Sequence, residues 1–298
     1  MLQSLSVSFL LDPFTALFAP FAVEFVQRAL LTGALVAVIC GIVGTWVVLR
    51  GMAFLGEAMA HGMLPGIAVA TLLGIPPILG AAISAGGMSL GIGLLQRRGR
   101  LSADTSIGLL FVASLALGVI VISASRSFAT DATAILFGDI LAAAPSNVLT
   151  LAIVAVVTVI VAAAGHRSFV AITVDARQAQ LLGLRPQLAH VLVVALITLA
   201  VVAAYQAVGS LLVVGMLLGP AVAAGRWAKR IPSTMALAAL IGAASVAIGL
   251  LISWHAGTAA GATIAFVAIL AAAVSAALRS VFTTSTLGRP RARVERTS

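Results

Sequence analysis

The sequence predicts an all-α protein with many membrane-spanning helices. Of its 298 residues, 62% are hydrophobic and only 8% are charged, whereas soluble domains carry about 25% charged residues. The apolar residues form runs of about 20, the length that a helix needs to cross a bilayer core of about 30 Å. Strands of a membrane barrel would instead alternate over segments of about ten residues. Because a chain in lipid must satisfy its own backbone hydrogen bonds, helices fit these runs.

We expect a polytopic helical membrane protein with about nine transmembrane helices, within limits of eight and ten. Each predicted span is rich in Ala, Leu, Val and Gly, and short polar or basic segments separate most of them. The predicted spans are residues 29–49, 54–74, 77–95, 106–125, 148–164, 188–207, 209–224, 233–253 and 258–278.

These spans define one transmembrane domain, residues 23–280. Residues 1–22 are predicted to be an N-terminal interfacial segment, because Asp12 and Pro13 interrupt their apolar stretch and no early basic residues mark a signal peptide. A tenth span there is the alternative. Residues 281–298 form a basic tail without an apolar pattern. Residues 126–146 are predicted to form a short interfacial or re-entrant helix.

The basic residues predict the orientation. All but two of the 17 Lys and Arg residues follow the first, third, fifth, seventh or ninth predicted span. Short cytoplasmic loops are enriched in Lys and Arg, so the C-terminus and the basic tail are predicted to be cytoplasmic. The expected location is the plasma (inner) membrane, in contact with the lipid bilayer. The net charge of +9 lies in these loops and therefore does not indicate a nucleic-acid partner.

Two segments about half a chain apart resemble each other. Residues 62–70 read GMLPGIAVA and residues 215–223 read GMLLGPAVA, so seven of nine positions are identical. The predicted topology gives them opposite directions, as in the inverted repeats of many transporters; chance similarity between segments built from few small residues is the alternative. Pro65, Gly66, Gly219 and Pro220 are predicted to be gating or kink positions, because proline bends a helix and glycine permits close helix contact.

Glu57 and His61 are the candidate metal ligands. Glu57 is the only acidic residue well inside a predicted span, and His61 follows it at i+4, on the same helix face. A charged side chain near the middle of a bilayer costs several kcal/mol and usually faces a cavity, a partner or an ion. A carboxylate with an imidazole suits manganese, iron or zinc. A symmetric dimer could supply two of each ligand. The alternative is that the two residues only pair with each other or with backbone groups near Pro65.

The energy source is predicted to be either an ion gradient or an ATPase on a separate chain. The phosphate-binding pattern G-x-x-x-x-G-K-[ST] is absent, because the single lysine, Lys229, is followed by Arg230. The chain is therefore not expected to be an enzyme or to carry a resident cofactor. Within the predicted cytoplasmic loop of residues 166–187, residues 175–183 read as a short helix that ends at Gly183. Such a helix is a natural docking surface, although an ordinary connector would have the same composition.

The chain resembles, over residues 25–278, the permease subunits of metal-ion ABC importers of the zinc/manganese/iron chelate uptake family. The resemblance is most specific at residues 47–66, VVLRGMAFLGEAMAHGMLPG, where the family shows G-D-A-x-x-H-A-x-L-P-G with its Asp and His lining the metal path. Glu57 stands at the Asp position, His61 at the His position and Gly62 at an Ala position. Near residue 260 the family often has Pro where this chain has Ala260.

The resemblance implies a homodimeric permease, a cytoplasmic ATPase subunit and an extracytoplasmic metal-binding solute protein. It also implies an ATPase-docking helix at Asp175, Ala176, Arg177, Ala179, Leu182 and Gly183. Three alternatives remain: a siderophore- or corrinoid-type ABC permease, which needs a wider and neutral path; an ion-coupled secondary transporter, which needs more deep ionisable groups; and a non-transporting membrane component of a surface-protein system.

Overall fold

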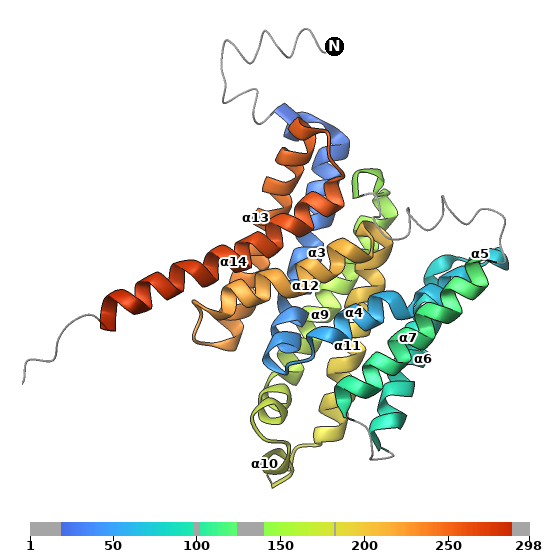
Figure 1. Ribbon diagram of the computed structural model, residues 1–298, viewed down its shortest axis with the longest axis vertical. Coiled ribbons are helices and arrows are strands. Elements are labelled where there is room, and N and C mark those ends of the chain that lie inside the picture. Colours follow the sequence, from blue (N-terminus) through green and yellow to red (C-terminus); the bar gives the residue numbers. More distant parts are fainter. Residues whose placement is uncertain (1–18, 98–101, 124–139, 182, 288–298) are drawn as a thin grey trace, which may run out of the picture.

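The computed structural model describes residues 19–97, 102–123, 140–181 and 183–287. Within these ranges the regular structure is helical and contains no β-strand (Figure 1). The elements, in chain order, are η1 (Ala19–Ala22), α3 (Glu24–Leu49), α4 (Ala53–Gly62), α5 (Leu64–Leu72), α6 (Pro77–Arg97), α7 (Ala103–Ser123), η2 (Ile140–Ala142), α9 (Pro145–Val174), α10 (Ala176–Leu181), α11 (Pro186–Val208), α12 (Ser210–Gly225), α13 (Ile231–Ala256) and α14 (Ala260–Leu287).

Eight helical segments in the described ranges are long and apolar enough to cross a membrane, with α4 and α5 together forming one of them. They match eight of the nine predicted spans. The remaining predicted span is α12, an apolar helix of only 16 residues. At 1.5 Å per residue it is about 24 Å long, shorter than a bilayer core of about 30 Å. The fold is the predicted one, and one of its helices is shorter than a full span.

Several expectations fall on other residues. The interfacial segment predicted at 1–22 lies outside the described residues except for η1, and residues 288–298 of the basic tail also lie outside them. Of the helix predicted between residues 126 and 146, the described part contains the 3-10 turn η2 and the start of α9. The domain limits therefore remain predictions.

Two connections lie at opposite ends of the described structure. The turn between α13 and α14 lies at the top of Figure 1, and α10 lies at the bottom; the sequence predicts these two connections on opposite sides of the membrane. Gly209, with φ +78°, makes the turn between α11 and α12 possible, because only glycine adopts positive φ at little cost.

Helix α3 lies at the centre of the packing. It contacts α9, α11, α12 and α13, and its glycines permit backbone approach: a Cβ atom at Gly41 would meet the backbone of Ala239, and one at Gly44 would meet the carbonyl of Leu217. Small residues drive helix association in lipid, because apolar side chains gain little there from leaving lipid. The α4–α5 span is buried to a similar extent, so the segment with Glu57 lies inside the helix bundle.

Helix α9 is longer than predicted. The sequence places the end of this span at residue 164, before His166 and Arg167, but the helix continues to Val174 and has 30 residues, or about 45 Å. The prediction that a loop begins at His166 is therefore wrong. The reason is packing: Phe169 is fully buried and lies edge-on to Trp46 of α3, with ring centroids 5.4 Å apart. This contact keeps the extension helical beyond its apolar part.

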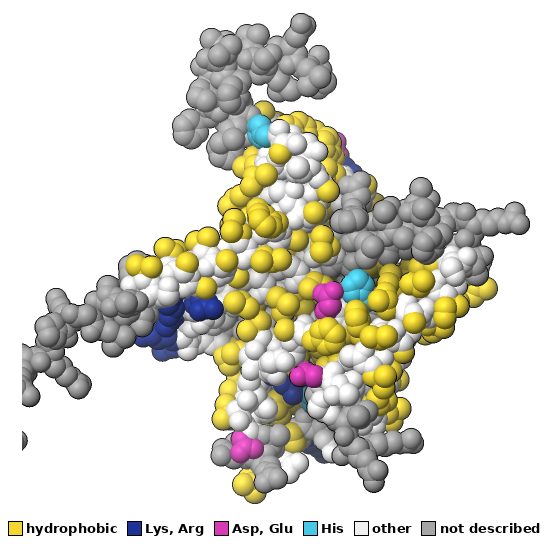
Figure 2. Space-filling view, in the orientation of Figure 1, with side chains coloured by type: hydrophobic (Ala, Val, Ile, Leu, Met, Phe, Trp, Pro, Cys, Tyr) yellow, Lys and Arg dark blue, Asp and Glu magenta, His cyan; other side chains and the backbone are white. Residues whose placement is uncertain are grey.

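Large apolar side chains cover much of the outer surface, as the yellow regions of Figure 2 show. Ile83 and Leu90 of α6 and Ile120 of α7 are mostly exposed. Soluble monomers rarely expose apolar patches beyond a few hundred Å², whereas lipid is the natural partner of such a surface.

Candidate functional site

The predicted pair lies on helix α4, immediately before a break in the second span. Helix α4 ends at Gly62, Met63 separates the two helices, and α5 begins at Leu64 with Pro65 in its first turn. Proline has no N–H to donate to the carbonyl four residues earlier, which is that of His61. The helix is interrupted at Met63, two residues before Pro65, and a kink at Pro65 stays a prediction. The carbonyl of Gly62, also at the break, accepts a hydrogen bond from Ser84 Oγ at 2.7 Å.

The side chains of Glu57 and His61 meet as the i, i+4 spacing predicts. Nε2 of His61 lies 3.1 Å from Oε1 of Glu57, and the exposed fractions of the two side chains are 38% for Glu57 and 20% for His61. Nδ1 of His61 is buried and has no hydrogen-bond partner among the described residues. The pair is thus partly open, and one imidazole nitrogen is unsatisfied.

Neighbouring helices hold this pair in place. Phe111 of α7 lies edge-on to the imidazole of His61, with centroids 5.7 Å apart, and also contacts Phe54. On the other side, a Cβ atom at Gly56 would meet Leu217 of α12. In Figure 2, one acidic and one histidine side chain lie together in the middle of the visible face, among apolar side chains.

One chain supplies an incomplete metal shell. In the described part of the chain, no group of three or more His, Cys, Asp or Glu residues could hold a metal ion. Glu57 and His61 offer one carboxylate and one imidazole, a mixed O and N set that suits intermediate divalent metals. A tightly held ion would need further ligands from elsewhere.

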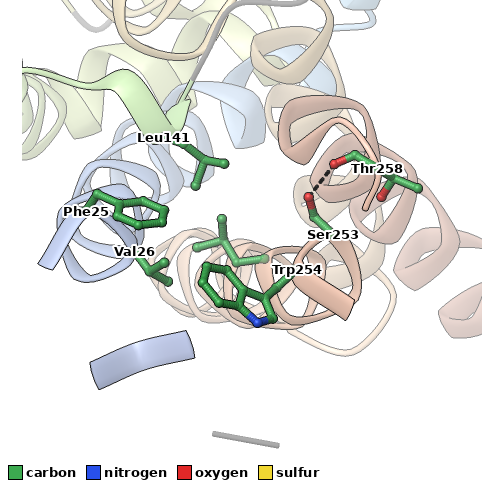
Figure 3. Close-up of a pocket in the computed structure, with 7 residues that line it drawn as sticks. Phe25, Val26, Leu141, Ser253, Trp254 and Thr258 are labelled. Atoms are coloured by element: carbon green, nitrogen blue, oxygen red, sulfur yellow. Dashed lines mark hydrogen bonds between the residues drawn. The ribbon is translucent and has the colours of Figure 1, made fainter. Parts of the chain in front are cut away.

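A pocket of about 240 Å³ lies elsewhere in the structure. It lies between the start of α3 and the turn joining α13 to α14, and Ser253 there donates a hydrogen bond to the carbonyl of Thr258 at 2.6 Å (Figure 3). It contains no ionisable side chain, so it is not a candidate cation site. Its lining residues are Phe25, Val26, Leu141, Leu250, Ser253, Trp254 and Thr258.

The two similar segments pack in similar ways. A Cβ atom at Gly66 would meet the backbone carbonyl of Gly80 in α6, and one at Gly219 would meet that of Ala268 in α14. Both glycines therefore mark a close approach to a neighbouring helix. The two prolines differ, because Pro65 follows a break whereas α12 continues unbroken through Pro220. A gating role for these positions remains a prediction.

The predicted docking segment folds as the short helix α10. Its six residues begin after Asp175, and Gly183, at φ +71°, ends the turn that follows. Ala179 is buried, whereas Leu181 is 89% exposed. Leu182 lies outside the described residues, so its place in this surface is not assigned.

Sequence reasoning did not find the contact between Arg50 and His190. Nη2 of Arg50, at the end of α3, lies 3.0 Å from Nδ1 of His190 in α11. The sequence places both residues near the cytoplasmic ends of their spans, which is the one signal that could have suggested proximity.

These features define a class of protein: a multi-pass helical permease of the plasma membrane, with an ionisable pair at a break in its second span. The chain matches the model of the ABC 3 transport family over residues 22–279. It belongs to that family.

Known relatives and one solved structure agree with this assignment. The chain is 36% identical over 247 residues to the manganese transport system membrane protein MntC of Listeria monocytogenes, covering 83% of this chain and 88% of the relative. It is 35% identical over 252 residues to the manganese import system permease protein ScaB of Streptococcus gordonii, covering 85% and 90%. Its fold matches a chain of PsaBC from Streptococcus pneumoniae in complex with Fab, with a TM-score of 0.78, 30% identity and coverage of 88% and 95%.

Proposed function

We propose that this protein is the permease subunit of an ATP-driven importer that moves divalent transition-metal ions, manganese, zinc or iron, into the cytoplasm. The observation that carries the proposal is the Glu57–His61 pair at the break between α4 and α5. The names of the relatives support manganese, and a relative from Haemophilus influenzae, 32% identical, is named a probable iron transport system membrane protein. Zinc rests on ligand chemistry alone.

The partners follow from the same proposal. A cytoplasmic ATPase subunit would bind at α10, an extracytoplasmic solute-binding protein would deliver the ion, and a second copy of the chain would complete the path. Two copies would supply two carboxylates and two imidazoles. These four groups would complete the metal coordination shell that one chain leaves incomplete. Binding and hydrolysis of ATP on the partner would then expose the ion to one side of the membrane and the other in turn.

A siderophore- or corrinoid-type permease and a non-transporting component are not favoured. The relatives' names refer to manganese and iron transport, and the wider, neutral path of a siderophore or corrinoid permease would not contain a carboxylate beside an imidazole inside a span. Within such a path, Glu57 would attract the cation and His61 would donate a lone pair from one imidazole nitrogen.

Uptake of manganese, zinc and iron into proteoliposomes tests the proposal. The vesicles would contain the permease, its ATPase and its binding protein, and the variants would be Glu57→Ala and His61→Ala, with His255→Ala as the matched control. His255 is exposed and lies at a helix end, where its Nδ1 contacts the carbonyl of Leu251. We expect both site variants to lose ATP-dependent uptake while assembly and the control stay intact. Unchanged uptake in both site variants would contradict the proposal.

A further inference from the structure

The turn between α12 and α13 carries a dense group of positive charges. Residues 225–230 read GRWAKR, and Arg226, Trp227, Lys229 and Arg230 are all exposed. Figure 2 shows Lys and Arg side chains gathered at this turn, beneath α14. We call Arg226, Trp227, Lys229 and Arg230 the basic turn.

The basic turn has a fixed shape. The N–H groups of Trp227 and Ala228 both donate to the carbonyl of Ala224 at 3.0 Å. Nε1 of Trp227 donates to Ser275 Oγ of α14 at 2.6 Å, and this buried hydroxyl donates in turn to the carbonyl of Ala223 at 3.0 Å. The turn is therefore tied to α14, and its cations are presented from an ordered backbone.

Helix α14 adds a further positive charge beside the turn. Arg279 follows Ser275 at i+4, so both lie on the same face of α14, one helical turn apart. Since Ser275 contacts Trp227, this spacing places the exposed Arg279 next to the basic turn. Trp227 thus joins the basic turn to α14, and together the two elements carry four cations: Arg226, Lys229, Arg230 and Arg279.

The sequence on either side of the basic turn has no negative charge. No Asp or Glu occurs between residues 176 and 294, a stretch that includes the whole of α11 to α14. Among the residues that the structure describes, no carboxylate lies within ion-pair distance of Arg226, Lys229 or Arg230. Arg226, Lys229 and Arg230 therefore present positive charge that the described residues do not neutralise, and an anionic ligand suits such a group.

The short helix α12 places these cations at the level of the lipid headgroups. With 16 residues it is about 6 Å shorter than a bilayer core of about 30 Å. A short span draws its flanking residues into the interface, where Trp, Lys and Arg are favoured. Basic clusters directly beside a span, on the cytoplasmic side, bind anionic lipid.

We propose that the basic turn and the adjacent face of α14 bind the phosphate headgroups of anionic phospholipids in the cytoplasmic leaflet. The lipid phosphates accept from the guanidinium groups of Arg226 and Arg230 and from the ammonium group of Lys229. Trp227 holds the site together through Ser275. This inference depends on the position of the turn in the membrane and not on the transported ion.

The test measures retained lipid. Full-length permease would be equilibrated in vesicles of phosphatidylcholine and phosphatidylglycerol, extracted in mild detergent, and analysed for lipid bound per protein. We expect Arg226→Gln/Lys229→Gln/Arg230→Gln to reduce the enrichment of phosphatidylglycerol at least about tenfold. The matched control Arg289→Gln/Arg291→Gln/Arg293→Gln removes as many charges from the tail, on the same predicted side, and should keep the enrichment.

Two outcomes overturn the proposal. One is enrichment that is unchanged in the turn variant, and the other is enrichment that falls equally in the tail control. If the triple variant does not fold, the single variants Lys229→Gln and Arg226→Gln test the proposal in its place. Each should lower the enrichment, and no change in either also overturns the proposal.

Discussion

The guanidinium of Arg50 hydrogen-bonds the imidazole of His190, with 3.0 Å between Nη2 and Nδ1, and this contact joins the end of α3 to α11. Arginine has only donors, so Nδ1 of His190 must be the acceptor and the imidazole proton lies on Nε2. Burial lowers the pKa of the Arg50 guanidinium from its ordinary value, but the group stays charged. Its Nη1 is buried and has no partner among the described residues. His190 is therefore an important acceptor for a poorly satisfied charge.

Replacing His190 by Ala should destabilise the fold. The substitution removes an acceptor from a partly buried guanidinium, and an unsatisfied buried donor costs about 1–3 kcal/mol. Thermal unfolding of the purified permease in detergent would measure the loss. His190→Asn is the matched control, because its amide oxygen can accept the same hydrogen bond and should recover part of the stability. Equal melting of His190→Ala and wild type would contradict this role.

Two glycines of α6 should respond in opposite directions to the same substitution. A Cβ atom at Gly80 would meet the backbone carbonyl of Gly66 in α5, whereas one at Gly87 would meet nothing within 4 Å. Gly80→Ala should therefore cost about 1–3 kcal/mol through overpacking. Gly87→Ala should gain up to about 1 kcal/mol from helix propensity. The same unfolding assay compares them, and a Gly80→Ala variant as stable as Gly87→Ala would show that α5 and α6 do not pack this closely.

The sequence could predict spans and local pairs because hydropathy and helical spacing determine them. Glu57 and His61 are four residues apart, so one helix brings them together without any knowledge of the fold. The contact between Arg50 and His190 spans 140 positions and depends on how α3 packs on α11. The length of α9 likewise depends on Phe169 packing against Trp46, which outweighs the polar signal of His166 and Arg167. Packing between distant segments is the information that one sequence does not display.

Conservative changes at Glu57 should separate charge from geometry. Glu57→Gln keeps the size of the side chain and its contact with His61 but removes the negative charge that would bind a cation. Uptake should fall more than roughly tenfold, since even outer-shell changes cost metal sites 10- to 100-fold. Glu57→Asp keeps the charge on a side chain one methylene shorter, so uptake should persist with a changed preference among manganese, zinc and iron. Competition between the three metals in proteoliposomes measures both effects, and full uptake by Glu57→Gln would contradict a ligand role.

The exposed side chain of Leu181 should contribute to ATPase binding. Leu181 ends α10 and is 89% exposed, while Ala179 of the same helix is buried and anchors it. An exposed leucine on a short helix outside the spans suits the apolar centre of a protein interface. Leu181→Ser should therefore reduce co-purification of the ATPase and ATP-driven uptake together, with no change in melting temperature. Leu73→Ser is the matched control, because Leu73 is also exposed but lies in the turn between α5 and α6. If both variants retain the ATPase equally, α10 does not dock it through Leu181.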